Sequence, residues 1–215
     1  MPLQLECAIR SAVTRAMDGD DPGELLKVLQ FQPPPDTGFF QSLCRLFRQR
    51  EDGLDALRRH CLQTALLARE LAADRARPGE AFVAGLLHEV HALLHGADGS
   101  DARDTLAALA GSSPQSAVLL RAWNLPATVV NAIAEHGRAL QTGLAPAGGL
   151  GGVLWVAHRF AHRLDGSARI DALSAGRIAA TLGLNRNALE RAIAAARSRY
   201  QARVGVRQSA AARST

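Results

Sequence analysis

The stretch Ala84-Gly85-Leu86-Leu87-His88-Glu89-Val90-His91 decides how the rest of the chain is interpreted. It places a histidine and a carboxylate side by side within an apolar run of helical character. Burying an imidazole or a carboxylate costs free energy unless the group is hydrogen-bonded, paired or bound to a metal. The pair therefore indicates a site, or the remains of one, on a helix that faces the core.

The composition predicts a single helical domain. At 215 residues the chain is long enough for one well-buried core and too short for two ordinary domains with a linker. Hydrophobic residues make up 47% and aromatic residues only 4%, and alanine, leucine and arginine dominate. These residues favour helices, whereas a sheet needs more β-branched and aromatic side chains. The predicted fold class is all-α.

Breakers and apolar periodicity divide the chain into three parts. Residues 1–38 are predicted to be an N-terminal helical extension, which ends in a proline run that cannot be helical and which offers a contact for a homodimer. Residues 39–204 form the main helical domain, and residues 205–215 are expected to be a disordered tail. Within the main domain, helices are expected at 39–50, 54–73, 78–95, 112–123, 126–137, 153–164, 171–182 and 186–204, with a loop at 143–152.

Charge and cysteine content limit the partners and the compartment. The formal charge of +5 belongs to the C-terminal end, where seven arginines from residue 185 onward stand against one glutamate. Three cysteines without CxxC spacing fit buried thiols in a reducing compartment. The sequence has no apolar run of membrane-spanning length and no signal segment, so we expect a cytoplasmic protein without a membrane partner.

Four histidines fall on four different predicted helices, each in an apolar context: His60, His88, His136 and His158. Helix bundles build metal sites from side chains that face a common interior in this way. A single histidine of this kind is more often a hydrogen-bonded core residue, so only the four together indicate a metal site.

The order of these residues resembles the HD superfamily, in which an isolated histidine, a His-Asp doublet and a distant aspartate bind metal. His60, His88 and Glu89 fall in the first three places, and His158 falls in the last. The resemblance implies a metal site formed by these four residues.

The closer resemblance is to the HDOD family, the HD-related output domain of bacterial signalling proteins. It is carried by Leu57-Arg-Arg-His60, by the segment from Ala81 to His88, and by Trp123-Asn-Leu-Pro126, and it spans roughly residues 39–189. The resemblance implies a single helical bundle of the HD/HDOD type.

Departures from the family pattern concern the residues that activate water. Active relatives such as the HD-GYP cyclic-dinucleotide phosphodiesterases follow the doublet with Ile-Gly-Lys, whereas this chain has Val90-His91-Ala92. A set with one carboxylate and several imidazoles favours zinc or nickel over magnesium. Glu89 also carries its oxygens about 1.5 Å further from the helix than an aspartate would. We therefore expect a vestigial site with no catalytic residue and no resident cofactor, the alternative being a divalent transition metal.

The leading functional hypothesis is a non-catalytic bacterial regulatory domain. It would bind a signalling protein, and in a further variant a nucleotide second messenger, through the HD cleft or the surface around Trp123 and His136. The alternative is a metal-dependent phosphohydrolase that acts on cyclic dinucleotides or nucleotides and uses the predicted ligands to generate hydroxide.

Two further patterns lead to weaker hypotheses. His88, His91 and His95 would lie on one stripe of a continuous helix and could form a second metal site. Residues 175–191 resemble a helix-turn-helix with arginines on its second helix, which is a DNA-binding arrangement. We favour a helix pair that closes the bundle, so nucleic acid is not an expected partner.

Overall fold

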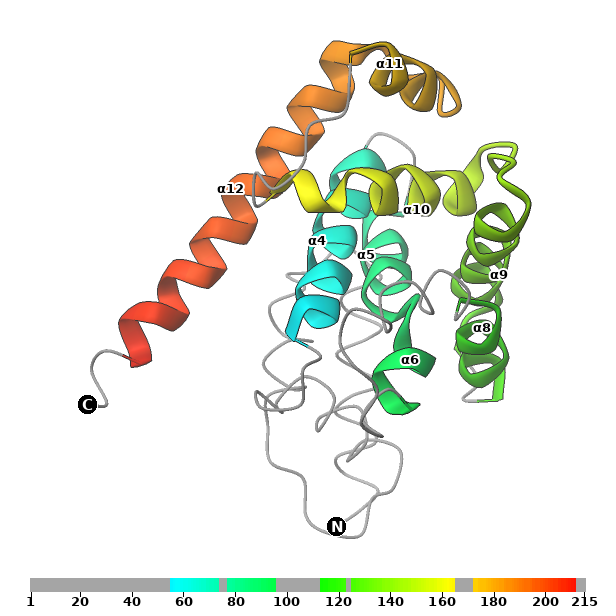
Figure 1. The fold of residues 1–215 in the computed structure, drawn as a ribbon, viewed down its shortest axis with the longest axis horizontal. Coiled ribbons are helices and arrows are strands. Elements are labelled where there is room, and N and C mark those ends of the chain that lie inside the picture. Colours follow the sequence, from blue (N-terminus) through cyan, green and yellow to red (C-terminus); the bar gives the residue numbers. More distant parts are fainter. Residues whose placement is uncertain (1–54, 74–76, 96–112, 123–124, 165–171, 212–215) are drawn as a thin grey trace, which may run out of the picture.

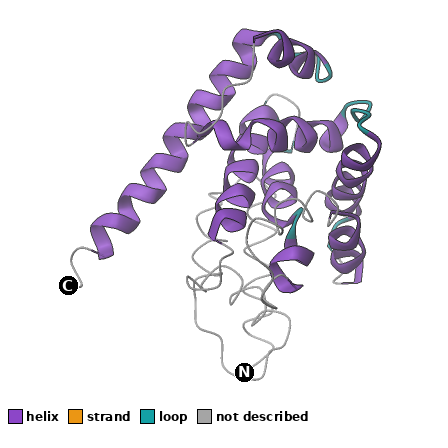
Figure 2. Ribbon diagram, in the orientation of Figure 1, coloured by secondary structure: helices purple, strands orange, loops and turns teal. Residues whose placement is uncertain are grey.

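The computed structural model describes residues 55–73, 77–95, 113–122, 125–164 and 172–211, and within these residues every regular element is a helix (Figures 1 and 2). The all-α prediction is confirmed. The extension predicted at 1–38 and the candidate partner residue Trp123 lie outside the described residues. Within the described ranges, no helix combines the length and the apolar character needed to cross a lipid bilayer.

The helices pack as two neighbouring pairs with a crossing helix (Figure 1). One pair is α4 with α5, the other is α8 with α9, and α10 packs against both α4 and α9. The long helix α12 packs along α4 and then extends away from the bundle (Figure 1). In chain order the elements are α4 (Asp55–Leu71), α5 (Pro78–Leu87), α6 (Val90–His95), α8 (Ser113–Ala122), α9 (Ala127–Thr142), α10 (Gly149–Phe160), the 3-10 helix η1 (Ala161–Leu164), α11 (Ala172–Ala180) and α12 (Arg186–Ala211).

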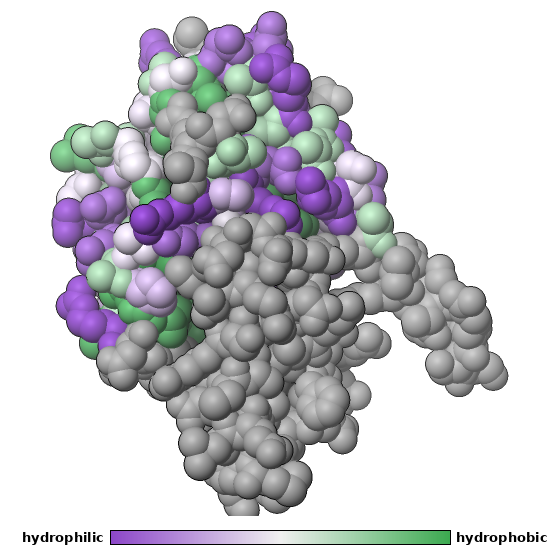
Figure 3. Space-filling model, turned by 180° about the vertical axis from the view of Figure 1, so that it is seen from behind, coloured by the Kyte–Doolittle hydropathy of each residue, from purple (hydrophilic) through white to green (hydrophobic). Residues whose placement is uncertain are grey.

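The core is centred on α5, whose residues from Gly79 to Leu87 are all buried. This helix begins with a proline in its first turn, where the missing N–H costs nothing. Its sequence is apolar except for Glu80, which pairs with Arg77 at 2.7 Å. Phe82 of α5 and Phe160 of α10 are among the largest fully buried side chains. Seen from behind, the described surface is mainly hydrophilic with smaller hydrophobic areas (Figure 3).

Two glycines permit the close helix contacts on which the site depends. A Cβ atom at Gly85 would lie 2.6 Å from the Cα atom of Ala65, so α5 meets α4 backbone to backbone. A Cβ atom at Gly137 would lie 2.7 Å from the ring of Pro114, so α9 meets the first turn of α8 equally closely. Real Cβ atoms do not approach other atoms to these distances, and only glycine fits at either position.

The helix predicted from residue 78 to residue 95 is interrupted at the His-Glu doublet. α5 ends at Leu87, the doublet forms a turn, and α6 begins at Val90. His88 Nδ1 bonds to the carbonyl oxygen of Gly85, and the backbone N–H of Glu89 is directed to the thiol of Cys61. These two bonds compete with the backbone hydrogen bonds that would continue α5, so the helix ends at the doublet. The prediction of a histidine stripe on one continuous helix is therefore wrong, and the side chain of His95 lies outside the described residues.

Three other boundaries differ from the predictions. α9 continues through Gly137 and ends only at Thr142, where Gly143, with a φ of 72°, forms a left-handed helix cap. α10 begins at Gly149, so the second half of the predicted loop 143–152 is helical. α12 extends to Ala211, past the expected end at residue 204 and into the tail that was expected to be disordered. Glycine weakens a helix in isolation, but tertiary packing overrides that preference at residues 137 and 149–152.

Candidate metal centre

Four imidazole rings meet inside the bundle. His60 comes from α4, His88 from the turn after α5, His136 from α9 and His158 from α10. The ring centroids of His158 lie 4.8 Å from both His60 and His136. The centroid of His88 lies 5.3 Å from His60, 5.3 Å from His136 and 5.4 Å from His158. The prediction that these residues face a common interior therefore matches the arrangement of the rings.

The spacing of the rings fits ligands that share one ion. Zn–N bonds are about 2.0–2.1 Å long, so two imidazoles on one tetrahedral ion have centroids roughly 5.2 Å apart. The five centroid distances given above bracket this value. The ligand atoms of His60, His88 and His158 all lie within 4.8 Å of one another, whereas bound nitrogens lie about 3.4 Å apart. To bind one ion together, the ring nitrogens would therefore have to move toward one another by distances on the order of 1 Å.

The hydrogen bond of His88 leaves its second nitrogen facing the centre as an acceptor. Nδ1 lies 2.8 Å from the carbonyl oxygen of Gly85. A carbonyl oxygen only accepts, so Nδ1 carries the proton and Nε2 carries the lone pair. Metal-binding histidines are characteristically oriented in this way, by donating their other ring N–H to a backbone carbonyl or a carboxylate.

Three buried ring nitrogens of the set have no hydrogen-bond partner among the described residues: His88 Nε2, His136 Nε2 and His158 Nδ1. Buried polar atoms without a partner are uncommon in folded proteins, because each costs its full desolvation free energy. Three of them on adjoining rings point to a missing electron-pair acceptor. A divalent transition-metal ion is such an acceptor, and neutral imidazole suits zinc, nickel and copper.

The histidines are held in the neutral form that a metal requires. Burial lowers the pKa of His60 to about 4, helped by the charge of His162. Burial also lowers the pKa of His88, His136 and His158 well below the usual value, and the mutual repulsion of the imidazolium forms adds to it. Arg159 contributes to the pKa lowering at both His136 and His158. No proton would therefore have to be displaced when a cation binds near neutral pH.

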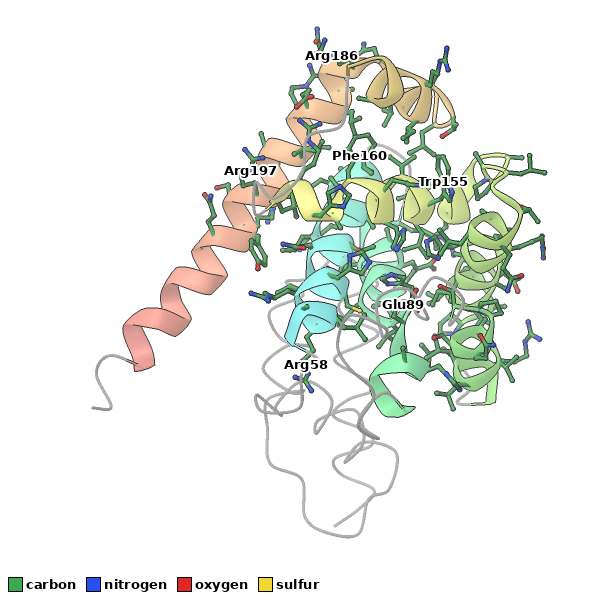
Figure 4. The ribbon with its side chains drawn as sticks, in the orientation of Figure 1. Arg58, Glu89, Trp155, Phe160, Arg186 and Arg197 are labelled. Carbon is green, nitrogen blue, oxygen red and sulfur yellow. The ribbon has the colours of Figure 1, made fainter. Side chains whose placement is uncertain are left out.

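Glu89 lies at the edge of the centre rather than within the ring of imidazoles. Figure 4 places it where α5 gives way to α6, beneath α10 with Trp155 and Phe160. Its Oε1 atom accepts a hydrogen bond from Ser113 Oγ at 3.1 Å and lies 3.8 Å from His88 Nε2. Glu89 is 2% exposed, and the hydroxyl of Ser113 is equally shielded from solvent. The only carboxylate of the predicted ligand set therefore already has a partner on α8.

The sequence-based interpretation gave His136 two roles, as one of four histidines facing a common interior and as part of a partner-binding surface, and its burial fits the first role. Its ring is 0% exposed and packs against His88 and His158. Ser113 was missed altogether: its Oγ lies 3.2 Å from His136 Nδ1, in addition to its bond to Glu89. In the sequence, Ser113 stands directly before Pro114 at a helix start, a pattern that predicts a helix cap. This pattern does not predict a contact between Ser113 and α9.

The C-terminal arginines that motivated the DNA-binding alternative are partly engaged within the protein. Arg199 pairs with Glu70 of α4 at 2.8 Å, and Arg197 donates to the carbonyl oxygen of Arg163 at 2.7 Å. Figure 4 shows Arg197 on the part of α12 beside the bundle and Arg186 at the end next to α11. Arg197 and Arg199 thus help to attach α12 to the bundle.

A separate groove of about 1070 Å³ lies between α9, the start of α10 and the start of α5. Its lining includes Arg77, Glu135, Arg138 and Leu144, and none of the four histidines contributes to it. Leu144 and Val118 are the large hydrophobic side chains that stay exposed within the described ranges. The groove is therefore distinct from the histidine centre.

The comparison with protein families gives one match. The model of the HD domain family matches residues 57–179, which is more than half of the chain and includes all four histidines. A comparison with curated proteins and another with solved structures gave no match.

Proposed function

The chain belongs to the HD domain family, and from this premise we propose that it is a non-hydrolytic regulatory domain of the HDOD type. In this proposal its histidine centre holds one divalent transition-metal ion, and the domain acts by binding a signalling protein. The observation that carries the proposal is the convergence of four neutral imidazoles, three with an unpartnered buried nitrogen.

The number of imidazoles supports a structural rather than a hydrolytic site. Structural zinc sites have four protein ligands, whereas catalytic sites have three and keep a position for water. The ligand atoms of His60, His88 and His158 lie within 4.8 Å of one another. In this proposal His136, whose ring packs against those of His88 and His158, supplies the fourth nitrogen. When bound, the ion would supply cross-linking of α4, α9, α10 and the turn after α5, and no coordination position would remain for a reactive hydroxide.

The chemistry of the donors supports the same proposal. Hard ions that activate water for phosphoryl transfer prefer carboxylate oxygens. The aspartate of the doublet is replaced by Glu89, which accepts a hydrogen bond from Ser113, and the last aspartate of the family pattern is replaced by His158. This donor set favours zinc or nickel and disfavours magnesium.

Two measurements on the same preparation test the proposal. Protein purified without a histidine tag should contain about one equivalent of a transition metal by elemental analysis. His158→Ala should lose most of it, whereas His162→Gln should retain it, because His162 lies one turn along from the ring of imidazoles. The same protein should not hydrolyse bis(p-nitrophenyl) phosphate or cyclic dinucleotides. Hydrolysis that disappears in His88→Ala, or metal-free protein that takes up no zinc, would overturn the proposal.

A second candidate function is metal-dependent phosphohydrolysis, and one observation favours it. Glu89 Oε1 lies 3.8 Å from His88 Nε2, close to the separation expected for two ligands of one ion. If Glu89 binds the ion in place of His136, a water position stays open. Hydrolysis by the metal-loaded protein that survives His136→Ala and is lost in Glu89→Gln would support this function.

A further inference from the structure

We infer that Ser113 is a positioning residue, which together with Glu89 holds His136 in the tautomer that presents its Nε2 lone pair to the centre. The inference rests on the proposed metal site, but its main readout needs no metal. It concerns three residues from three different parts of the fold: the turn after α5, the start of α8 and the middle of α9. All three are buried, so water does not compete for their hydrogen bonds.

Counting donors and acceptors fixes the direction of both bonds. A serine hydroxyl has one hydrogen to donate, and an ionised carboxylate only accepts. Ser113 therefore donates its hydrogen to Glu89 Oε1 at 3.1 Å. Its oxygen can then only accept, and it lies 3.2 Å from His136 Nδ1. His136 Nδ1 must carry the ring proton, which leaves Nε2 as the unprotonated nitrogen.

The unpartnered state of His136 Nε2 agrees with this direction. An Nε2–H group buried without an acceptor would be a lost donor, whereas an Nε2 lone pair at the centre is what a cation requires. An ionised Glu89 is the condition under which the serine hydrogen points toward it.

Glu89 has one methylene group more than an aspartate, and this extra length allows it to reach Ser113. An aspartate at this position would end about 1.5 Å closer to its own backbone. The longer side chain instead reaches Ser113 on α8 and becomes an indirect partner of the centre. Carboxylates that act through a histidine in this way orient the ring and strengthen it as a ligand.

Tautomers can be read directly from long-range ¹H–¹⁵N spectra of uniformly labelled, metal-free protein at neutral pH. We expect the Nδ1–H form for both His136 and His88. In Ser113→Ala, His136 should shift toward the Nε2–H form, whereas His88 should stay unchanged because its partner is the carbonyl oxygen of Gly85. Ser116→Ala is the matched control. Ser116 is an equally buried serine of α8, but its hydroxyl accepts from the backbone N–H of His91.

Zinc titration provides the second readout. Ser113→Ala and Glu89→Gln should each weaken zinc binding by roughly 10- to 100-fold. The visible spectrum of the cobalt-loaded variants should keep the wild-type pattern, because no ligand atom is removed. Ser116→Ala should bind zinc as the wild type does. An Nε2–H form of His136 in the wild type, or an unchanged tautomer in Ser113→Ala, overturns the inference. A tautomer shift in a protein that binds no zinc would leave the inference standing and remove the proposed function instead.

Discussion

The histidine centre and the arginine-rich helix α12 are both concentrations of polar nitrogen, and they differ in what happens to it. In the centre, three ring nitrogens are buried without a partner, and all can offer a lone pair. On α12, Arg199 pairs with Glu70 and Arg197 bonds to a backbone carbonyl. One guanidinium nitrogen, Arg197 Nε, is also buried without a partner, but a guanidinium has no lone pair with which to bind a cation.

The difference shows that the number of charged residues is a poor guide to function in this protein. Seven arginines dominate the charge of the C-terminal end, and part of their role is to attach a helix. Four histidines carry no charge when buried, and they form the arrangement that calls for a ligand.

The largest effect is expected from acid on the metal-free protein. Unfolded histidines have a pKa near 6.5, whereas burial lowers the folded pKa of His60 to about 4 and that of His88, His136 and His158 well below the usual value. Below pH 6.5 the unfolded chain therefore binds more protons than the folded protein, and stability falls as the pH falls. The slope is about 1.4 kcal/mol per pH unit for each histidine that stays neutral, so four give up to roughly 5 kcal/mol per unit.

Urea unfolding at pH 7, 6 and 5 measures this slope. The variant His158→Gln should show a shallower dependence, because one buried imidazole is removed. A free energy of unfolding that is the same at pH 7 and pH 5 would contradict the burial of the histidines as neutral groups.

The next effect is stabilisation by metal. Zinc at a free concentration 100 times its dissociation constant should raise the free energy of unfolding by about 2.7 kcal/mol. His158→Ala should not respond, and His162→Gln should respond like the wild type. Thermal unfolding with zinc and with a chelator measures the difference. Equal stabilisation of His158→Ala would place the ion elsewhere in the protein.

A smaller effect is expected from the contact that brings α4 and α5 together. Gly85→Ala would set a methyl group 2.6 Å from the Cα atom of Ala65, and overpacking of this kind costs about 1–3 kcal/mol. Zinc affinity should fall as well, because His60 and His88 would be pushed apart. Gly176→Ala in α11 is the control: nothing lies within 4 Å of its added methyl group, and alanine favours a helix. A wild-type melting temperature for Gly85→Ala would contradict the close approach.

The smallest effect is expected on the arginine helix. Arg199→Ala removes a partly exposed ion pair with Glu70 and should cost no more than about 1 kcal/mol. Zinc binding should not change, which would sharpen the contrast between the two regions. A loss of metal in this variant would mean that α12 supports the centre, and chemical denaturation together with zinc titration distinguishes the two outcomes.

Much of the fold could be predicted because its signals are local. Apolar spacing predicted a helix at 54–73, and α4 spans Asp55–Leu71. Pro78 marked the start of α5, since proline suits the first turn. Gly137 misled the prediction of the end of α9, because its role is a contact with Pro114 and not a helix cap. The sequence alone does not distinguish a glycine that caps a helix from one that permits a close helix contact. Only the position of the neighbouring helix distinguishes them.

The sequence by itself determined the helical class, the spacing of the histidines and the scarcity of carboxylates among the candidate ligands, because composition and periodicity are properties of the chain alone. The tertiary structure decided that His136 faces inward beside His88 and His158, and that Glu89 accepts from Ser113. These contacts join residues from separate helices. Their geometry depends on how closely α4 approaches α5 and how closely α8 approaches α9, and that approach is set by packing across the whole bundle.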